Sequence, residues 1–429
     1  MADREFGFET LALHAGQIPD AATGARVTPI YQTTSFVFDD ADHAASLFNL
    51  QTFGNIYSRL SNPTNSVLEE RIAALEGGRA AVAVGSGMSA QMVALLTLLQ
   101  AGDHMVSAKT LYGGTYSQFD VTFRRMGIDT TFVDPDDMDS FAKAITEKTK
   151  VIYAETLGNP LINVLDIEAI ADVAHAAGLP LVIDNTFPTP YLCRPMEFGA
   201  DIVVHSATKF IGGHGTTMGG LLVESGKFPW DNGNFPMMME PSEGYHGVKF
   251  YETFGDFGFT MKARVETLRT LGPALSPFNA FLLLQGLETL PLRMDRHCEN
   301  ALAVAKFLDE HPNVEWVRYP SLPNDKYYDL AQKYVPRGAS AIMSFGVKGG
   351  QAAGVKFIES VQFLSHLANV GDAKTLVIHP ASTTHRQMSE EQQISAGITP
   401  DMVRISVGLE TLDDILWDLD QALAAASSD

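Results

Sequence analysis

Short apolar runs alternate with helical patterns along the chain from residue 79 to about residue 210. In the helical stretches apolar positions recur every three to four residues, which is the period of an amphipathic helix. This alternation predicts a doubly wound α/β domain, in which helices cover a largely parallel sheet. The predicted strands are Ala80–Val84, His104–Ala108, Thr130–Val133, Val151–Glu155, Leu181–Asp184 and Ile202–His205. The predicted helices are Met88–Leu99, Thr115–Arg125, Met138–Thr146 and Ile167–Ala176.

The rest of the chain has a different character. Residues 1–63 lack a sustained period and predict an irregular N-terminal arm that packs on something else. Residues 228–259 are dense in Gly, Met, Pro and aromatic residues and predict a long ordered loop. The pattern therefore predicts an arm (1–63), a large domain (64–276) and a smaller α+β C-terminal domain (277–429). The last domain rests on predicted helices Asn279–Leu290 and Arg293–Leu308 and on predicted strands Val314–Tyr319, Ala341–Phe345 and Val403–Val407.

Composition limits the partners and the location. With 429 residues, 45% of them apolar and 19% charged, the chain can bury a large core. Its net charge of -21 argues against nucleic acid or an anionic membrane as a partner. No apolar run approaches the roughly 18 residues of a membrane helix, and we expect a cytoplasmic location.

Neither cysteines nor histidines predict a metal site or a disulfide framework. The two cysteines, Cys193 and Cys298, have no paired spacing. The histidines are scattered without the spacing of metal ligands, so we expect no catalytic metal. Those that fall near other motifs are His205, His214, His379 and His385.

A lysine directly after a predicted strand is the first candidate for chemistry. Ser206-Ala207-Thr208-Lys209 follows the strand Ile202–His205, at the carboxyl end where an open α/β sheet binds ligands. A desolvated lysine amine forms a Schiff base with an aldehyde, and the two hydroxyl groups would hold a phosphate of that aldehyde. An ordinary exposed lysine is the alternative.

Asp184 ends the apolar strand Leu181–Asp184, where a carboxylate is costly unless it meets a cation or several donors. In an enzyme that uses pyridoxal 5′-phosphate (PLP) it would meet the pyridinium N–H and keep the ring able to withdraw electrons. The alternative is an N-cap of the next helix, helped by Asn185 and Thr186.

A third motif predicts an anion site. Gly85-Ser86-Gly87-Met88 joins the strand Ala80–Val84 to a predicted helix, and it places free N–H groups and the positive end of the helix around one point. A tight turn in which the glycines serve only geometry is the alternative.

Three further residues follow strands or interrupt them. Tyr112, between Leu111 and Gly113-Gly114, would lie flat over a bound heterocycle, or be a buried core tyrosine. Asn159, before Pro160, would bind a phenolic oxygen of the cofactor, or be a turn residue. Arg404 is a cation in an apolar strand and would bind a substrate carboxylate bidentately, or an internal Asp or Glu.

Taken together, these residues resemble the Cys/Met-metabolism PLP enzymes of aminotransferase fold type I, and the resemblance covers nearly the whole chain. The motifs that carry it are Tyr57-Ser58-Arg59-Leu60-Ser61-Asn62-Pro63-Thr64, Asp184-Asn185-Thr186, Ser206-Ala207-Thr208-Lys209, His379-Pro380-Ala381-Ser382 with Thr384-His385, and Arg404-Ile405-Ser406-Val407-Gly408. The resemblance implies a mostly parallel seven-stranded sheet. It also implies Lys209 as the Schiff-base lysine, Asp184 as the partner of the ring nitrogen, Tyr112 as a stacking and catalytic residue, and Arg404 as the carboxylate binder.

The same resemblance implies a phosphate site and a shared assembly. The phosphate contacts would come from Ser86, Gly87, Met88, Ser206 and Thr208, and from Tyr57 and Arg59 of a neighbouring subunit in a homotetramer, a dimer of dimers.

Within the family the chain looks most like the subgroup that converts O-acetylhomoserine and sulfide to homocysteine and acetate, the O-acetylhomoserine sulfhydrylases. Gly213-His214-Gly215-Thr216-Thr217 follows the lysine where cystathionine enzymes and methionine γ-lyases tend to have Gly-His-Ser-Asp. Gly114 stands where methionine γ-lyases typically carry Cys, and residues 228–259 exceed the shorter cystathionine enzymes. A γ-eliminating lyase, a cystathionine γ-synthase and a PLP-binding protein without catalysis are the alternatives.

Overall fold

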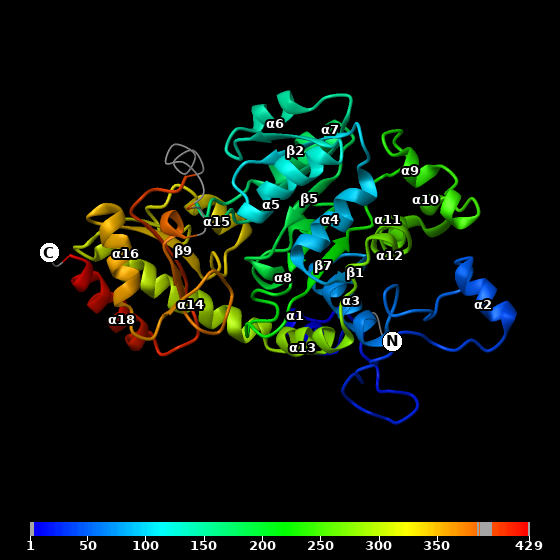
Figure 1. The fold of residues 1–429 in the computed structure, drawn as a ribbon, viewed down its shortest axis with the longest axis horizontal. Helices are drawn as coiled ribbons and strands as arrows, with labels where there is room; N and C mark the ends of the chain where they lie inside the picture. Colours follow the sequence, from blue (N-terminus) through cyan, green and yellow to red (C-terminus); the bar gives the residue numbers. More distant parts are fainter. Residues whose placement is uncertain (1–3, 384–385, 387–396, 428–429) are drawn as a thin grey trace.

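The computed structural model describes residues 4–383, 386 and 397–427, which form a larger and a smaller β-sheet with helices around each (Figure 1). The larger sheet has seven strands in the order β1-β7-β6-β5-β4-β2-β3. Strand β7 runs antiparallel to β1 and β6, and the other neighbours are parallel. The strands are β1 (Ala80–Val84), β2 (His104–Ala108), β3 (Asp129–Val133), β4 (Thr149–Glu155), β5 (Leu181–Asp184), β6 (Ile202–Ser206) and β7 (Gly220–Glu224).

Helices cover both faces of this sheet, which explains why its central strands are apolar throughout. One face packs Ile183 and Val203 into the cluster that includes α3, and the other packs Val182 and Val204 into the cluster that includes α4. The helices and helical turns around the sheet are α3 (Pro63–Glu76), α4 (Gly87–Leu98), α5 (Gly113–Ser117), a π-helical turn (Gln118–Phe123), α6 (Met138–Ala144), α7 (Ile167–Ala176), α8 (Thr189–Leu192) and a 3-10 turn (Pro195–Phe198).

The six predicted strands of the larger sheet are confirmed to within two residues at each end, and the predicted fold class is confirmed with them. Strand β7 lies outside the predicted strands, because Gly219 and Gly220 interrupt the local pattern just where it begins. The predicted helix Thr115–Arg125 is divided between α5 and the π-helical turn that follows it.

The prediction of a long loop over residues 228–259 is wrong in part, because short helices occupy much of it. They are α9 (Pro236–Met239), a 3-10 turn (Glu243–Tyr245), α10 (Phe250–Phe254), a 3-10 turn (Gly255–Phe257) and the start of α11 (Gly258–Lys262). Trp230 stacks on Phe259 and meets Phe235 edge to face, so the segment packs its aromatic rings inward. Helices this short leave no amphipathic period in the sequence.

The smaller sheet has the order β10-β11-β12-β9-β8, and α14, α16 and α18 lie along one of its faces (Figure 1). Strands β8, β9 and β12 confirm the three predicted ones, whereas β10 and β11 are too short to have shown a pattern. The strands are β8 (Val314–Arg318), β9 (Ile342–Val347), β10 (Ser365–His366), β11 (Leu376–Ile378) and β12 (Met402–Ser406). The helices of this region are α13 (Pro277–Glu288), α14 (Leu290–Glu310), α15 (Tyr328–Tyr334), α16 (Gly350–Ser360) and α18 (Leu412–Ala426). A π-helical turn (Ala263–Leu268) and α12 (Arg269–Leu271) precede them.

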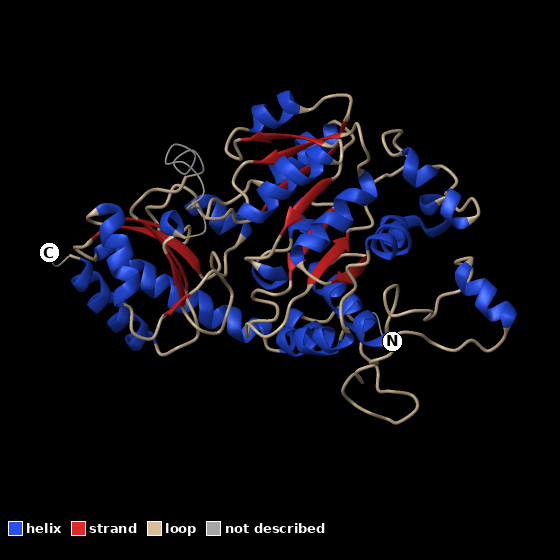
Figure 2. Ribbon diagram, viewed as in Figure 1, coloured by secondary structure: helices blue, strands red, loops and turns tan. Residues whose placement is uncertain are grey.

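The N-terminal arm has two short helices that the sequence pattern did not predict, α1 (Phe8–His14) and α2 (Ala41–Phe48). Figure 2 shows that α2, at the right of the view, stands away from both sheets, with long stretches of loop around it. Its neighbours in the arm, Val37 and Phe53, have 95% and 74% of their surface exposed. Such exposure of large apolar side chains is typical of a surface that another chain covers.

Candidate active site

A cavity of about 310 Å³ lies at the carboxyl ends of β4, β5 and β6, on the side that faces the smaller sheet. Its volume is at the lower end of the range typical for small-molecule sites, about 300–1,000 Å³. Its lining residues are far apart in the sequence, from Ser86, which follows β1, to Arg404 on β12. Its lining includes Ser86, Gly87, Met88, Tyr112, Asn159, Asp184, Ser206, Thr208, Lys209 and Arg404, together with Gln91, Thr115, Glu155, Leu157, Thr186, Phe187, Met218, Ala368, Asn369 and Val370.

Lys209 stands just beyond β6 with its amine in this cavity. Burial lowers the pKa of Lys209 to about 8, and the nearby Arg404 acts in the same direction. Its Nζ donates a hydrogen bond to Oδ1 of Asn369. A lysine with this pKa is neutral in roughly one tenth of molecules at pH 7, far more than an ordinary lysine, so its amine is more readily available as nucleophile and as base.

Asp184 ends β5 and does not cap a helix. Its Oδ1 accepts a hydrogen bond from the backbone N–H of Thr186 at 2.9 Å, and the following helix, α8, has Pro188 at its cap position. The N-cap alternative is therefore wrong. Burial raises the pKa of Asp184, although the hydrogen bonds from Thr186 oppose the rise. Among the described residues Asp184 forms no ion pair, so a cationic group entering the cavity would stabilise it.

Glu155 is a second buried carboxylate of the site, which the sequence argument did not single out. It ends β4 directly beside Asp184 in the sheet register, and its Oε1 accepts a hydrogen bond from the N–H of Tyr112 at 2.7 Å. Burial, followed by the charge of Asp184, holds the pKa of Glu155 well above its usual range. The sequence did contain the pattern that would have indicated Glu155, because this carboxylate ends an apolar strand just as Asp184 does.

The Ser86-Gly87-Met88 turn lies against the start of the Ser206–Lys209 segment. Ser86 caps α4, and its Oγ accepts a hydrogen bond from the N–H of Ser89 at 3.2 Å. A Cβ added to Gly87 would lie 2.5 Å from Cβ of Ser206, so only glycine allows this approach. The first N–H groups of α4 and the hydroxyls of Ser206 and Thr208 thus border one end of the cavity.

Tyr112 lines the cavity and is not a core residue. About half of its surface, 53%, is exposed, and the alternative of a buried core tyrosine is wrong. A Cβ added to Gly114 would lie 2.5 Å from Cε1 of Tyr112, so any larger residue at position 114 would clash with the Tyr112 ring.

Arg404 lies on β12 of the smaller sheet and points into the same cavity. Its Nη1 donates to Oδ1 of Asn159 at 3.2 Å, and its Nη2 makes a long contact of 3.5 Å with the carbonyl oxygen of Asn369. Burial lowers the pKa of Arg404 to about 10. Within the described part of the chain Arg404 has no carboxylate partner, which contradicts the alternative of an internal ion pair there.

Two predicted site residues lie elsewhere in this chain. Tyr57 and Arg59 are exposed in the N-terminal arm and do not line the cavity. The guanidinium of Arg59 lies over the ring of Tyr57, 5.4 Å from its centroid. The structure of one chain therefore does not bring them to the other site residues.

The described part of the motif that begins at His379 does not line this cavity. His379 is occupied by hydrogen bonds to Ser382 and to the carbonyl oxygen of Pro400, whereas Thr384 and His385 lie outside the described residues. No group of three or more His, Cys, Asp and Glu residues in the described ranges is arranged to hold a metal ion.

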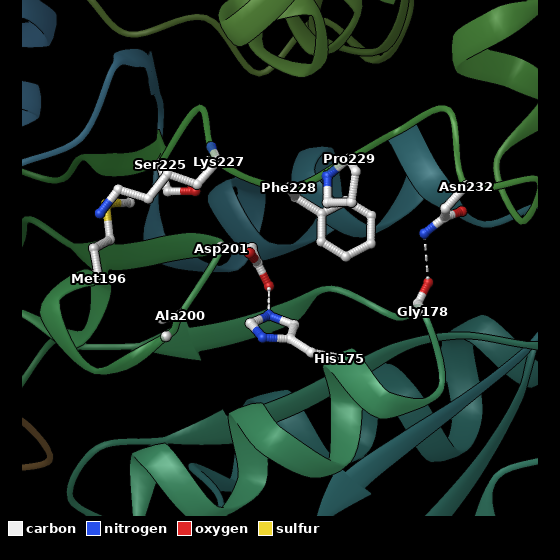
Figure 3. A pocket seen from close by; sticks show the side chains of 11 residues that line it. His175, Gly178, Met196, Ala200, Asp201, Ser225, Lys227, Phe228, Pro229 and Asn232 are labelled. Carbon is white, nitrogen blue, oxygen red and sulfur yellow. Dashed lines mark hydrogen bonds and ion pairs between the residues drawn. The ribbon is translucent and has the colours of Figure 1, made fainter.

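A second cavity, of about 210 Å³, lies at the amino end of β6 and the carboxyl end of β7, at the other end of these strands from the first cavity, and contains none of the predicted site residues. Figure 3 shows the hydrogen bond between Nε2 of His175 and Oδ2 of Asp201, which measures 2.8 Å, and Phe228 and Asn232 of the 228–259 segment beside it. The hydrogen bond to Asp201 raises the pKa of His175. The pair joins the end of α7 to the start of β6.

No helix in the described ranges has both the length and the apolar character needed to cross a membrane.

The chain is similar to known proteins over nearly its whole length. The family model described as Cys/Met metabolism PLP-dependent enzyme matches residues 9–424. O-acetyl-L-homoserine sulfhydrylase of Leptospira meyeri is 57% identical, over 98% of this chain and 97% of its own. Homocysteine synthase of Schizosaccharomyces pombe is 56% identical, over 98% of both chains.

A solved structure has the same fold over almost its whole length. It is a Campylobacter jejuni protein described as an O-acetylhomoserine (thiol)-lyase, with N′-pyridoxyl-lysine-5′-monophosphate in its chain. It superposes with a TM-score of 0.95 at 42% identity and covers 98% of this chain and 100% of its own. The match to the family model alone covers most of the sequence. This chain belongs to the Cys/Met metabolism PLP-dependent enzyme family.

Proposed function

We propose that the protein converts O-acetyl-L-homoserine and sulfide to L-homocysteine and acetate. The observation that supports an amino-acid substrate is the partly buried Arg404, which faces the same cavity as the Lys209 amine and has no carboxylate partner in the described ranges. The substrate class rests on the relatives named O-acetyl-L-homoserine sulfhydrylase and homocysteine synthase, which match nearly the full length of the chain.

The residues around the cavity fit PLP. Asp184, a carboxylate that forms no ion pair in the described part of the chain, would hold the pyridine nitrogen, and Tyr112 would cover the ring face. The start of α4 would hold the phosphate with Ser206 and Thr208, and Asn159 would hold the phenolic oxygen. Lys209 would carry the covalent link to the aldehyde carbon.

When bound, PLP supplies an electron sink for the substrate's Cα. Arg404 would grip the substrate carboxylate and so orient the Cα–H bond toward Lys209, because a guanidinium fixes a carboxylate in two directions. The Lys209 amine, released from its link, would take the proton from Cα and move protons at Cβ. Acetate would then leave from Cγ, and sulfide would add at the same carbon. Asn159 and Asn369 would keep Arg404 and Lys209 at these positions.

One assay separates the proposal from its rivals. Purified protein with O-acetylhomoserine and sulfide should form homocysteine and acetate in equal amounts, and the Lys209→Ala variant should form neither. Formation of α-ketobutyrate and ammonia at a rate that sulfide does not change would mean a γ-eliminating lyase. A much faster reaction with cysteine than with sulfide would mean a cystathionine γ-synthase.

We also propose that each site is built from two chains. Arg59 forms no ion pair in the described ranges, and the arm around it exposes large apolar side chains such as Val37 and Phe53. A second copy of the chain would cover these side chains and receive Arg59 and Tyr57 at its phosphate end. The smallest active unit would be a two-fold dimer, and two dimers would form a tetramer in the cytoplasm.

A further inference from the structure

A fully buried, hydrogen-bonded pair of a glutamate and a histidine lies behind the candidate site and does not line its cavity. Oε1 of Glu76, the last residue of α3, lies 2.6 Å from Nε2 of His205 on β6, and neither side chain has any exposed surface. Glu76 Oε2 and His205 Nδ1 are buried and have no hydrogen-bond partner in the described ranges. A buried pair with unsatisfied atoms adds little to stability compared with an apolar pair of the same size. Its presence calls for another explanation.

The same carboxylate oxygen also binds the residue after Asp184. Asn185 donates from Nδ2 to Glu76 Oε1 at 3.0 Å and to the carbonyl oxygen of Cys193 at 2.9 Å. Its Oδ1 accepts from Thr156 Oγ1 at 2.9 Å. Glu76 Oε1 therefore joins α3 to the ends of β5 and β6.

The two residues joined in this way are the chain neighbours of two candidate site residues. Asn185 follows Asp184, and His205 precedes Ser206, which begins the segment that ends at Lys209. Asp184 pairs with Val204 in the sheet, and the N–H of Asn185 donates to the carbonyl oxygen of Val204 at 3.0 Å. Any shift of the pair would change the spacing between these two strand ends.

The pair acts from the face of the sheet opposite to the Asp184 carboxylate. Side chains alternate along a strand, so Val182 and Asp184 share one face with Val204. Ile183 and Val203 pack on the other face, with α3, where Asn185 and His205 meet Glu76. Glu76 and His205 are thus outside the cavity, and they are connected to it through the backbone of β5 and β6.

The charge of this pair also bears on Asp184. Burial raises the pKa of Asp184, and the hydrogen bonds of Thr186 and then the positive charge of His205 oppose the rise.

We propose that Glu76 and His205 are positioning residues for the candidate site: they fix the ends of β5 and β6 relative to each other, and with them Asp184 and the segment from Ser206 to Lys209. This inference rests on the proposed function, because it assigns Asp184 to the pyridine nitrogen. It predicts that the pair controls the electronic state of the bound cofactor and leaves substrate affinity unchanged.

The test compares Glu76→Gln with Glu69→Gln. The Glu76→Gln side chain keeps an oxygen that accepts from His205 and Asn185 but loses the negative charge. Glu69 is a matched control, since it is a second buried carboxylate on α3, paired with Arg264 and bound to the N–H of Ala83, away from the cavity. The measurements are the thermal midpoint, the PLP content, the absorption spectrum of bound PLP, and kcat and KM for O-acetylhomoserine.

We expect Glu76→Gln to fold and to bind PLP, to shift the absorption spectrum, and to lower kcat with KM changed by less than about threefold. The loss should be roughly 10- to 100-fold, as found for outer partners of metal ligands. Glu69→Gln should lower the thermal midpoint and leave the spectrum unchanged. His205→Gln should match Glu76→Gln, and the double variant should be no worse than either, because the residues act as a unit.

A folded Glu76→Gln protein with the wild-type spectrum and kcat would overturn the inference, and so would the same spectral shift in Glu69→Gln. If Glu76→Gln does not fold, His205→Gln decides by the same criteria. The spectrum needs no substrate. A wild-type protein that makes no homocysteine would therefore refute the proposed function while the spectral comparison still tests the pair.

Discussion

Lys209 donates a hydrogen bond from Nζ to Oδ1 of Asn369, a residue 160 positions further along the chain. Asn369 belongs to the segment between β10 and β11 of the smaller sheet, whereas Lys209 follows β6 of the larger one. The backbone carbonyl oxygen of Asn369 also contacts Nη2 of Arg404. One residue thus contacts both the candidate nucleophile, Lys209, and the candidate carboxylate binder, Arg404.

Replacement of Lys209 by Ala should abolish both the covalent attachment of PLP and turnover, because the buried amine with its lowered pKa is the only candidate nucleophile in the described lining of the cavity. Reduction with borohydride followed by mass analysis of peptides measures the attachment. A reducible link that persists in a folded Lys209→Ala variant would place the anchor at another lysine.

Asp184→Asn should still bind PLP but lose activity by about 100-fold or more, because an amide does not stabilise a positive charge on the ring nitrogen. The amide keeps the size of the side chain and can still accept the hydrogen bond from Thr186. The measurements are PLP content and steady-state kinetics. Near-normal kcat in a PLP-loaded variant would remove Asp184 from the proposed mechanism.

Arg404→Ala should raise KM for O-acetylhomoserine while PLP content stays the same. A hydrogen-bonded charged partner contributes about 1.5–3 kcal/mol, which corresponds to about 10- to 100-fold in affinity. Arg293 offers the contrast, since this buried arginine donates to the carbonyl oxygens of Phe210, Ile211 and Gly286. Arg293→Ala should therefore lower the thermal midpoint, and Arg404→Ala should not. Loss of folding in Arg404→Ala would point to a structural role.

Mixed oligomers test the shared site. In a dimer of one Lys209→Ala chain and one Arg59→Ala chain, one site carries both lesions and the other carries none. Co-refolding should restore about one quarter of the wild-type activity, because half of randomly paired dimers are mixed and each has one intact site. A mixture of Lys209→Ala with Asp184→Asn is the matched control and should show no recovery, since every site keeps one lesion. No recovery in demonstrably mixed Lys209→Ala and Arg59→Ala dimers would assign Arg59 to its own chain.

Stability should fall with pH because of Glu224. Its Oε2 accepts from the N–H and Oγ1 of Thr260, and burial raises its pKa from 4.5 to about 7. A raised pKa of the folded state means that this stability is complete below pH 4.5 and is lost as pH rises through 7. The loss amounts to at most about 3 kcal/mol.

The Glu224→Gln variant, which does not ionise, should have a higher thermal midpoint than the wild type at pH 8, and the difference should shrink toward pH 5. Glu299→Gln is the control, because the Glu299 side chain is 72% exposed. A difference that does not depend on pH would contradict this prediction, because it would mean that the Glu224 carboxyl does not change its protonation state in this range.

Local pattern predicted much of the fold and of the candidate site. The central strands β4, β5 and β6 are largely apolar because helices cover them on both sides, and burial on both faces favours apolar residues at consecutive positions. Lys209, Asp184 and the Ser86-Gly87-Met88 turn were found because each directly follows such a strand, where a parallel sheet opens. The sequence motifs also identified the family. The roles of the individual residues, the domain limits and the oligomer remain predictions.

The packing of distant segments decided the rest. Asn369 sits in a loop without a period, and only the approach of the smaller sheet brings it to Lys209. The absence of a carboxylate beside Arg404 in the described ranges, and the pairing of Glu76 with His205 across 129 positions, are also properties of the tertiary structure. A sequence records whether a residue is buried through its chemical type and period, but it does not record which buried group it meets, because that contact depends on how whole elements pack.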